Sequence, residues 1–175
     1  MPDATLSPTL STPESPSLAR LIGRIAALIG SENFPTGERA ALKRLAPDRP
    51  PSLAFYRFCF QHLPEGWQRQ IGAWQTVLAG LALMGTSAHR PDRSVGQALA
   101  EHRYSEARLE RLLVAQDDVL YTLSLRVARF LAAKGESVNW LDLARLLLAQ
   151  DREKREAVRL QIAGDYYRHQ KNEKD

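Results

Sequence analysis

Cysteine and long apolar runs are scarce in this chain of 175 residues. Cys59 is the single cysteine, so the chain cannot form an internal disulfide or a cysteine-based zinc cluster. No stretch approaches the roughly 20 apolar residues of a membrane-spanning helix, and residues 1–16 lack the apolar run of a signal peptide. We therefore expect a cytoplasmic protein in which Cys59 is a small buried hydrophobe.

Motifs of catalysis and metal binding are also missing. The four histidines are scattered, and none has a second histidine or a cysteine at metal-ligand spacing. The sequence has neither a glycine-rich phosphate loop nor a nucleophile elbow. The one adjacent pair of carboxylates, Asp117 and Asp118, stands where a helix is expected to begin, so a capping role is predicted. We expect no enzyme, cofactor or metal site, although a helical nuclease stays an alternative because active sites need not have linear motifs.

What the chain does have is positive charge. Its net charge is +4 and its isoelectric point is about 9.5. Residues 1–16 carry Asp3 and Glu14 and no Lys or Arg, so the net charge rises to +6 when this segment is set aside. Such a balance favours an anionic partner, and a phosphate backbone is the first candidate.

Apolar spacing predicts helices throughout. The clearest stripe, Trp67 to Leu81 at steps of 4, 3, 4 and 3, predicts one long helix from Trp67 to about Gly85 with its tryptophans in the core. Ser17, Ser94 and Ser105 are predicted N-caps. Other helices are expected at about 18–29, 37–46, 52–62, 95–101, 117–134, 140–147 and 151–167. No strand alternation is seen, so the predicted fold is an all-α bundle of about eight or nine helices in two lobes.

Composition also divides the chain. Residues 1–16 hold four of the ten prolines and little to bury, which predicts a disordered tail. Residues 17–85 are predicted to form an N-terminal helical lobe and 94–168 a C-terminal one, joined by a polar loop at 86–93. Residues 169–175 are expected to be frayed.

Basic residues cluster on three of the predicted helices. If these clusters converge, they form a groove that holds a nucleic-acid backbone through phosphate contacts, which carry no sequence information. The planar fork of arginine suits this role. The alternative is that they are solvated helix faces, with Glu153 and Glu156 pairing locally. The candidate binding residues are Arg39, Lys43 and Arg44, then Arg126 and Arg129, and finally Arg152, Arg155 and Arg159.

A series of short motifs extends over about residues 37–167. The motifs are G-E-R-A-A-L-K-R-L at 37–45, A-F-Y-R-F at 54–58, S-V-G-Q-A-L-A at 94–100, S-E-A-R-L-E-R-L-L at 105–113, L-R-V-A-R at 125–129, V-N-W at 138–140 and the basic helix 151–159. In order and spacing they resemble the small subunit of the type I-E CRISPR surveillance complex, Cascade (the CasB family). Lys43 stands where that family usually has arginine, and Asn139 where it has aspartate; residues 1–16 have no counterpart.

The resemblance implies an all-helical, non-catalytic subunit without sequence preference. Its implied partners are the other Cascade subunits, a second copy of itself, and the target and displaced non-target DNA strands of a crRNA-guided R-loop. The family's basic surface falls on the candidate residues above, except that Arg39 joins them by geometry only. No membrane or small-molecule partner is implied. A purely structural adapter that meets acidic protein surfaces stays the alternative.

Overall fold

The computed structural model describes residues 17–170. Within this range the chain forms nine α-helices, one 3-10 helix and no strand, so the predicted all-α fold is confirmed; His89 and Val138 make an isolated β-bridge. The predicted tail 1–16 and residues 171–175 lie outside the described residues. The helices are α1 (Leu18–Gly30), α2 (Thr36–Lys43), α3 (Leu53–His62), a 3-10 helix (Trp67–Gln70), α4 (Ile71–Met84), α5 (Val95–Glu101), α6 (Glu106–Val114), α7 (Asp117–Ala133), α8 (Trp140–Leu148) and α9 (Arg152–His169).

Serine hydroxyls set the start of several helices, as predicted. The hydroxyls of Ser17, Ser94 and Ser105 each accept a hydrogen bond from the backbone N–H three residues later, at 3.4, 3.1 and 3.4 Å. Each bond satisfies an amide that the first turn of a helix leaves without a partner. Asp117 and Asp118 begin α7, as predicted, and lie in its first turn, where the helix dipole favours negative charge; the N-cap position itself is Gln116.

The single long helix predicted from Trp67 is interrupted. Residues Trp67–Gln70 form a 3-10 turn, and the backbone of Gln70 leaves helical geometry before α4 begins. The side-chain amide of Gln70 donates a hydrogen bond to the carbonyl oxygen of Leu148, 2.8 Å away in the other half of the molecule. This distant contact accompanies a break that the apolar spacing does not reveal, because the stripe continues on both sides of it.

Two other predicted helix ends shift by a few residues. Helix α2 ends at Lys43 rather than near Ala46, because the amides of the next two residues bond to carbonyls three residues back and tighten the last turn. Helix α9 includes His169, which was expected to be frayed; its ring nitrogen Nδ1 lies 2.8 Å from the carbonyl oxygen of Asp165.

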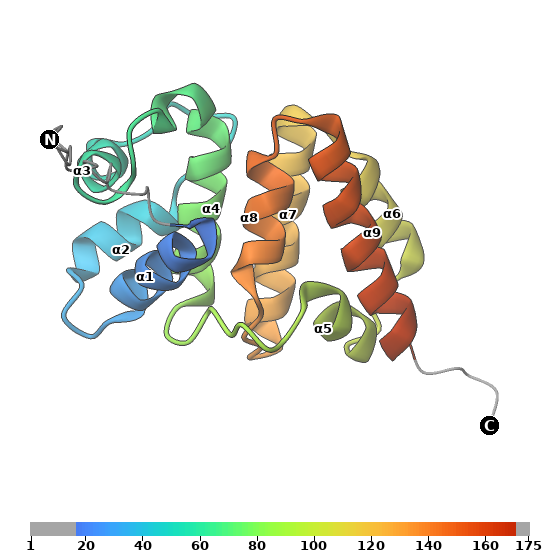
Figure 1. The fold of residues 1–175 in the computed structure, drawn as a ribbon. Helices are drawn as coiled ribbons and strands as arrows, with labels where there is room; N and C mark the ends of the chain where they lie inside the picture. The colour runs from blue at the N-terminus through green and yellow to red at the C-terminus, as the bar shows by residue number, and fades with distance from the viewer. Residues whose placement is uncertain (1–16, 171–175) are drawn as a thin grey trace, which may run out of the picture.

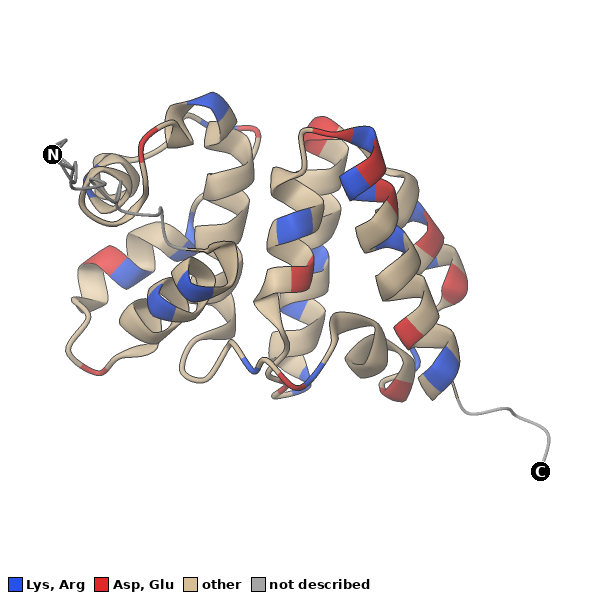
Figure 2. Ribbon diagram, viewed as in Figure 1, with Lys and Arg blue, Asp and Glu red and all other residues tan. Residues whose placement is uncertain are grey.

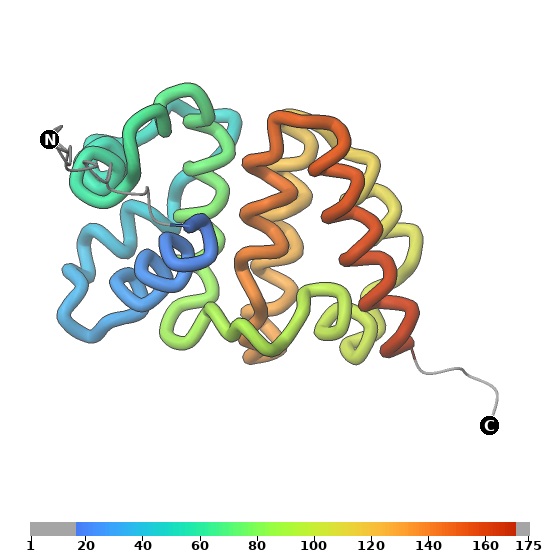
Figure 3. Tube along the Cα trace, in the orientation of Figure 1, coloured from blue at the N-terminus to red at the C-terminus, as the bar shows by residue number. Residues whose placement is uncertain are grey.

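Helix α4 lies between the two halves of the fold (Figures 1 and 3). It packs against α1 and α2 on one side and against α7 and α8 on the other, and every residue from Ala73 to Ala82 is buried. Both tryptophans of the predicted stripe, Trp67 and Trp74, are buried, as is Cys59. Burial raises the pKa of the Cys59 thiol to about 12. One continuous apolar core therefore runs through both halves.

The V-N-W motif joins the loop after α4 to α8. The backbone amide of Val138 donates to the carbonyl of Ala88, and the side chain of Asn139 accepts from the amide of Leu141 to cap α8. Trp140 is fully buried, and its indole N–H donates to the sulfur of Met84 at 3.1 Å. Its ring packs so closely on Gly80 of α4 that a side chain at Gly80 would collide with it.

Helices α5 and α9 also pack closely against each other. Gly96, in the S-V-G-Q-A-L-A motif, faces the backbone of α9. A β-carbon at this position would collide with the carbonyl oxygen of Ile162 and lie 2.8 Å from the backbone nitrogen of Tyr166. The glycine in the motif is therefore explained by the approach of two helix backbones.

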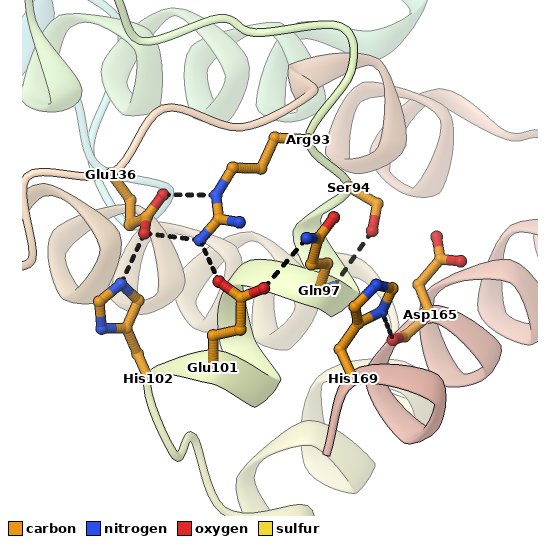
Figure 4. A network of polar contacts seen from close by, with 8 residues as sticks. All are labelled: Arg93, Ser94, Gln97, Glu101, His102, Glu136, Asp165 and His169. Carbon is orange, nitrogen blue, oxygen red and sulfur yellow. Dashed lines mark hydrogen bonds and ion pairs between the residues drawn. The ribbon is translucent and has the colours of Figure 1, made fainter. Parts of the chain in front are cut away.

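Arg93, in the loop between α4 and α5, connects this loop by hydrogen bonds to residues of the C-terminal half (Figure 4). Its guanidinium donates two hydrogen bonds to the carboxylate of Glu136, both of 2.7 Å, and one of 2.7 Å to Glu101. Gln97 also donates to Glu101, and the ring nitrogen Nε2 of His102 lies 2.6 Å from Glu136. The side chains of Arg93 and Glu136 are only 13% and 16% exposed, so this pair is shielded from water.

This arginine makes the fold sensitive to acid. Hydrogen bonds from Arg93 lower the pKa of Glu101 from 4.5 to about 2, and they also lower the pKa of Glu136. Because the folded pKa lies below the unfolded one, the stabilisation is present above about pH 4.5 and is lost as the pH falls toward 2. We expect Arg93→Met to lower the free energy of unfolding at pH 7 by about 1.5–3 kcal/mol, and to weaken its dependence on pH over that window.

Urea unfolding followed by circular dichroism at pH 7, 4.5 and 3 measures both effects. Arg90→Met is the matched control, because Arg90 pairs with Asp92 at the exposed surface and its loss should change stability far less. Equal losses in the two variants at pH 7 would contradict the role assigned to Arg93.

Candidate nucleic-acid interface

Helix α7 buries one side and presents arginines on the other. Leu120, Val127 and Leu131 are buried in the core, whereas the predicted binding residues Arg126 and Arg129 are both exposed. The apolar spacing of α7 therefore explains why these two guanidinium groups face solvent.

Arg126 lies beside two arginines that were not among the predicted binding residues. Arg108 and Arg111, three residues apart on α6, line a surface hollow together with Arg126, and all three are exposed. The hollow has a volume of about 330 Å³. None of the ion pairs formed among residues 17–170 involves any of these three arginines.

Aromatic rings support the hollow from beneath. Tyr104 and Phe130, with centroids 5.0 Å apart, pack edge to face, and the Tyr104 carbonyl accepts a hydrogen bond from the hydroxyl of Tyr166. The guanidinium of Arg108 lies 5.8 Å from the centre of the Tyr104 ring. Burial raises the pKa of Tyr104, and the positive charges of Arg108 and Arg126 oppose that rise.

The candidate residues of α2 have two different environments. Lys43 and Arg44 are exposed, and Arg44 shares a small hollow of about 130 Å³ with Arg49. Arg39 is partly buried and turned toward the end of α1: it donates hydrogen bonds to the carbonyl oxygens of Ile29 and Ser31 at 3.0 and 2.5 Å. A cation at this helix end satisfies carbonyls that have no partner within the helix, so the structure gives Arg39 a structural contact.

The three arginines of α9 also differ from one another. Arg152 is exposed, but Arg155 is partly buried and donates a 2.6 Å hydrogen bond to the carbonyl of Ala149. Arg159 is 21% exposed and lies 3.5 Å from Glu156, so the local pairing considered from the sequence exists for this residue. Acidic and basic residues alternate along the first half of α9 (Figure 2). The positive electrostatic potential of the α9 arginines is therefore partly cancelled by the neighbouring carboxylates of the same helix.

Of the predicted residues, only Arg126 lines the hollow, where its arginine neighbours are Arg108 and Arg111 of α6. The predicted residues of α9 do not line it, and α9 lies in front of α6 in Figure 1. A single groove built from α2, α7 and α9 stays a prediction. The signal that could have identified Arg108 and Arg111 was their spacing of three on a predicted helix, inside the motif at 105–113.

The described residues contain neither a cluster of metal ligands nor a membrane-spanning helix. Residues 17–170 contain no group of three or more His, Cys, Asp or Glu side chains placed to hold a metal ion. In the same range, no helix is both long and apolar enough to span a bilayer.

Comparison with known proteins gives a family match and two structural neighbours. The family model of CRISPR-associated protein Cse2 matches residues 38–167. A chain of a solved CRISPR RNA-guided surveillance complex is 20% identical with a TM-score of 0.63, and the alignment covers 86% of this chain and 94% of the other. A chain of such a complex in a pre-nicking state is 22% identical with a TM-score of 0.59, covering 86% and 91%. At these identities the structural matches support the fold. No curated protein sequence matches.

Proposed function

Because this chain belongs to the family of CRISPR-associated protein Cse2, we propose that it is a non-catalytic small subunit of an RNA-guided surveillance complex of the Cascade type. In this proposal it sits beside other subunits and a second copy of itself. Its basic surface holds the target and displaced strands of the R-loop without reading their sequence. The observation that carries the proposal is the set of exposed arginines on α6 and α7 without carboxylate partners among residues 17–170.

The physical chemistry of the R-loop suits such a subunit. Guide pairing supplies the sequence recognition, and the exchange of one duplex for another is close to balance. Modest contacts to the phosphate backbone are therefore enough to shift the equilibrium. A displaced strand that is held in place re-anneals less readily, which favours the open state.

The binding residues outside the hollow have unequal parts in this proposal. Lys43, Arg44, Arg129 and Arg152 are exposed and contribute phosphate contacts. Arg155 and Arg159 contribute less, because each is partly buried and already has a partner. Arg39 contributes least, since its guanidinium is bound to two backbone carbonyls.

Removing two exposed arginines of α7 tests the function. We expect Arg126→Ala with Arg129→Ala to keep helix content and melting temperature, because surface changes usually alter stability by under about 0.5 kcal/mol. Each lost phosphate contact should lower duplex affinity roughly eightfold at 0.1 M salt and reduce the slope of log affinity against log salt by about 0.9. Fluorescence anisotropy of labelled DNA at several salt concentrations measures both quantities.

The control is Arg20→Ala with Arg69→Ala, which removes the same charge from exposed positions on α1 and the 3-10 helix. It should weaken binding much less. Equal weakening in the two double variants would mean that net charge alone attracts DNA. A wild-type protein that leaves DNA unbound at low salt would reject the proposal in favour of a structural adapter.

A further inference from the structure

The hollow between α6 and α7 has properties that a solvated helix face does not have. Three guanidinium groups from two helices line one concavity, although like charges repel and gain nothing from proximity alone. A fourth cation is close by, since the Nζ atom of Lys134 lies 5.7 Å from the centre of the Phe130 ring. Such an arrangement stabilises the protein little, but it is well suited to a bound anion.

The lining of the hollow indicates which anion it fits. Guanidinium groups bind phosphate oxygens in pairs, which a lysine cannot do. Leu123 and Phe130 add an apolar part to the same lining. A free inorganic anion would leave that part uncovered, whereas a nucleotide presents a phosphate together with the carbon atoms of its sugar. A single strand has a flexible backbone, so it can bring both groups into a hollow. The volume of about 330 Å³ is at the lower end of small-ligand sites, so it accommodates one such unit.

The hollow is also held in shape before any ligand arrives. Tyr104 is buried, packs against Phe130, and has its carbonyl fixed by the hydroxyl of Tyr166 from α9. The position of Arg108 over the Tyr104 ring restricts its side chain. Less conformational entropy is therefore lost when a phosphate binds.

We infer that Arg108, Arg111 and Arg126 form a nucleotide-anchoring pocket that grips one internal phosphodiester of single-stranded DNA, with its sugar against Leu123 and Phe130. This inference rests on the proposed function and adds a defined site to it. The pocket fixes one point of the strand, and the remaining exposed cations follow the backbone on either side.

Two variants of α6 test the pocket without touching α7. In Arg108→Gln with Arg111→Gln, affinity for a labelled single strand should fall roughly 25-fold at 0.1 M salt, because each lost contact costs about fivefold on single strands. Affinity for a blunt duplex should fall less. In Arg108→Lys with Arg111→Lys, the salt slope should stay at the wild-type value while affinity falls at least about threefold, because charge remains but paired hydrogen bonds are lost. Arg20→Gln with Arg69→Gln is the charge-matched control.

Single strands with and without a 5′-terminal phosphate distinguish binding of an internal phosphodiester from binding of a terminal phosphate. We expect the glutamine variant to lose the same affinity for both strands. A loss confined to the 5′-phosphorylated strand would overturn the internal assignment. If the glutamine variant binds a single strand as well as wild type while Arg126→Ala with Arg129→Ala still weakens duplex binding, the pocket is rejected and the proposed function stands. If wild type binds no DNA, both fall.

Discussion

Truncation of Trp140 to alanine is expected to lower the free energy of unfolding by about 3–5 kcal/mol, the usual cost of removing a buried tryptophan. Its side chain has no solvent exposure and fills the space between α4 and α8 against Gly80. The truncation also removes the donor to the Met84 sulfur. Urea unfolding followed by circular dichroism measures the loss as a shift of the midpoint at constant slope.

A truncation at the surface is the control for this change. Leu160 on α9 is 66% exposed, so Leu160→Ala should change stability by less than about 0.5 kcal/mol. If Trp140→Ala does not fold at all, Trp140→Phe can be measured in its place, because it leaves a smaller cavity and should lose less of the free energy of unfolding. A loss below about 1 kcal/mol in Trp140→Ala would refute the packing described for α4 and α8.

The second large effect is expected from a single added methyl group, in Gly96→Ala. The new β-carbon would meet backbone atoms of Ile162 and Tyr166, which cannot rotate away as a flexible side chain would. The two helices must therefore separate, at a cost of about 2–3 kcal/mol in the free energy of unfolding. Thermal and urea unfolding both report this loss.

Gly23→Ala is the matched control, with an expected change of opposite sign. Gly23 lies within α1, and an added β-carbon there has no atom within 4 Å. Alanine is favoured over glycine in a helix by about 0.5–1 kcal/mol, so this variant should gain stability. If both alanines stabilise the protein, the close approach of α5 and α9 is wrong.

The helices were predictable because their signals are local. A serine followed by an apolar stripe determines where α5 and α6 begin, and no distant residue has to be known. The break at Gln70 was not predictable, since it coincides with a hydrogen bond to Leu148, 78 residues away. The close packing behind Gly96 and Gly80 is likewise invisible until the helices are placed in space.

The site was harder to predict than the fold, because spacing shows which residues share a helix face but not what faces them. Arg39 and Lys43 are four apart on α2, yet one binds backbone carbonyls and the other is exposed to water. Conversely, Arg108 and Arg126 lie on different helices and meet only because α6 packs on α7. The family resemblance identified from the motifs is confirmed by the family match over residues 38–167.

The position of α4 has a consequence for how the molecule unfolds. A helix that is buried on all sides belongs to both halves, and neither half can lose it without exposing a long apolar surface to water. Cutting the chain between α4 and α5 would leave the first fragment with an exposed apolar face on α4. The second fragment would have an exposed apolar surface on α7 and α8, which α4 normally covers. We therefore expect the two halves to unfold together in one cooperative transition, although a loop separates them in the sequence.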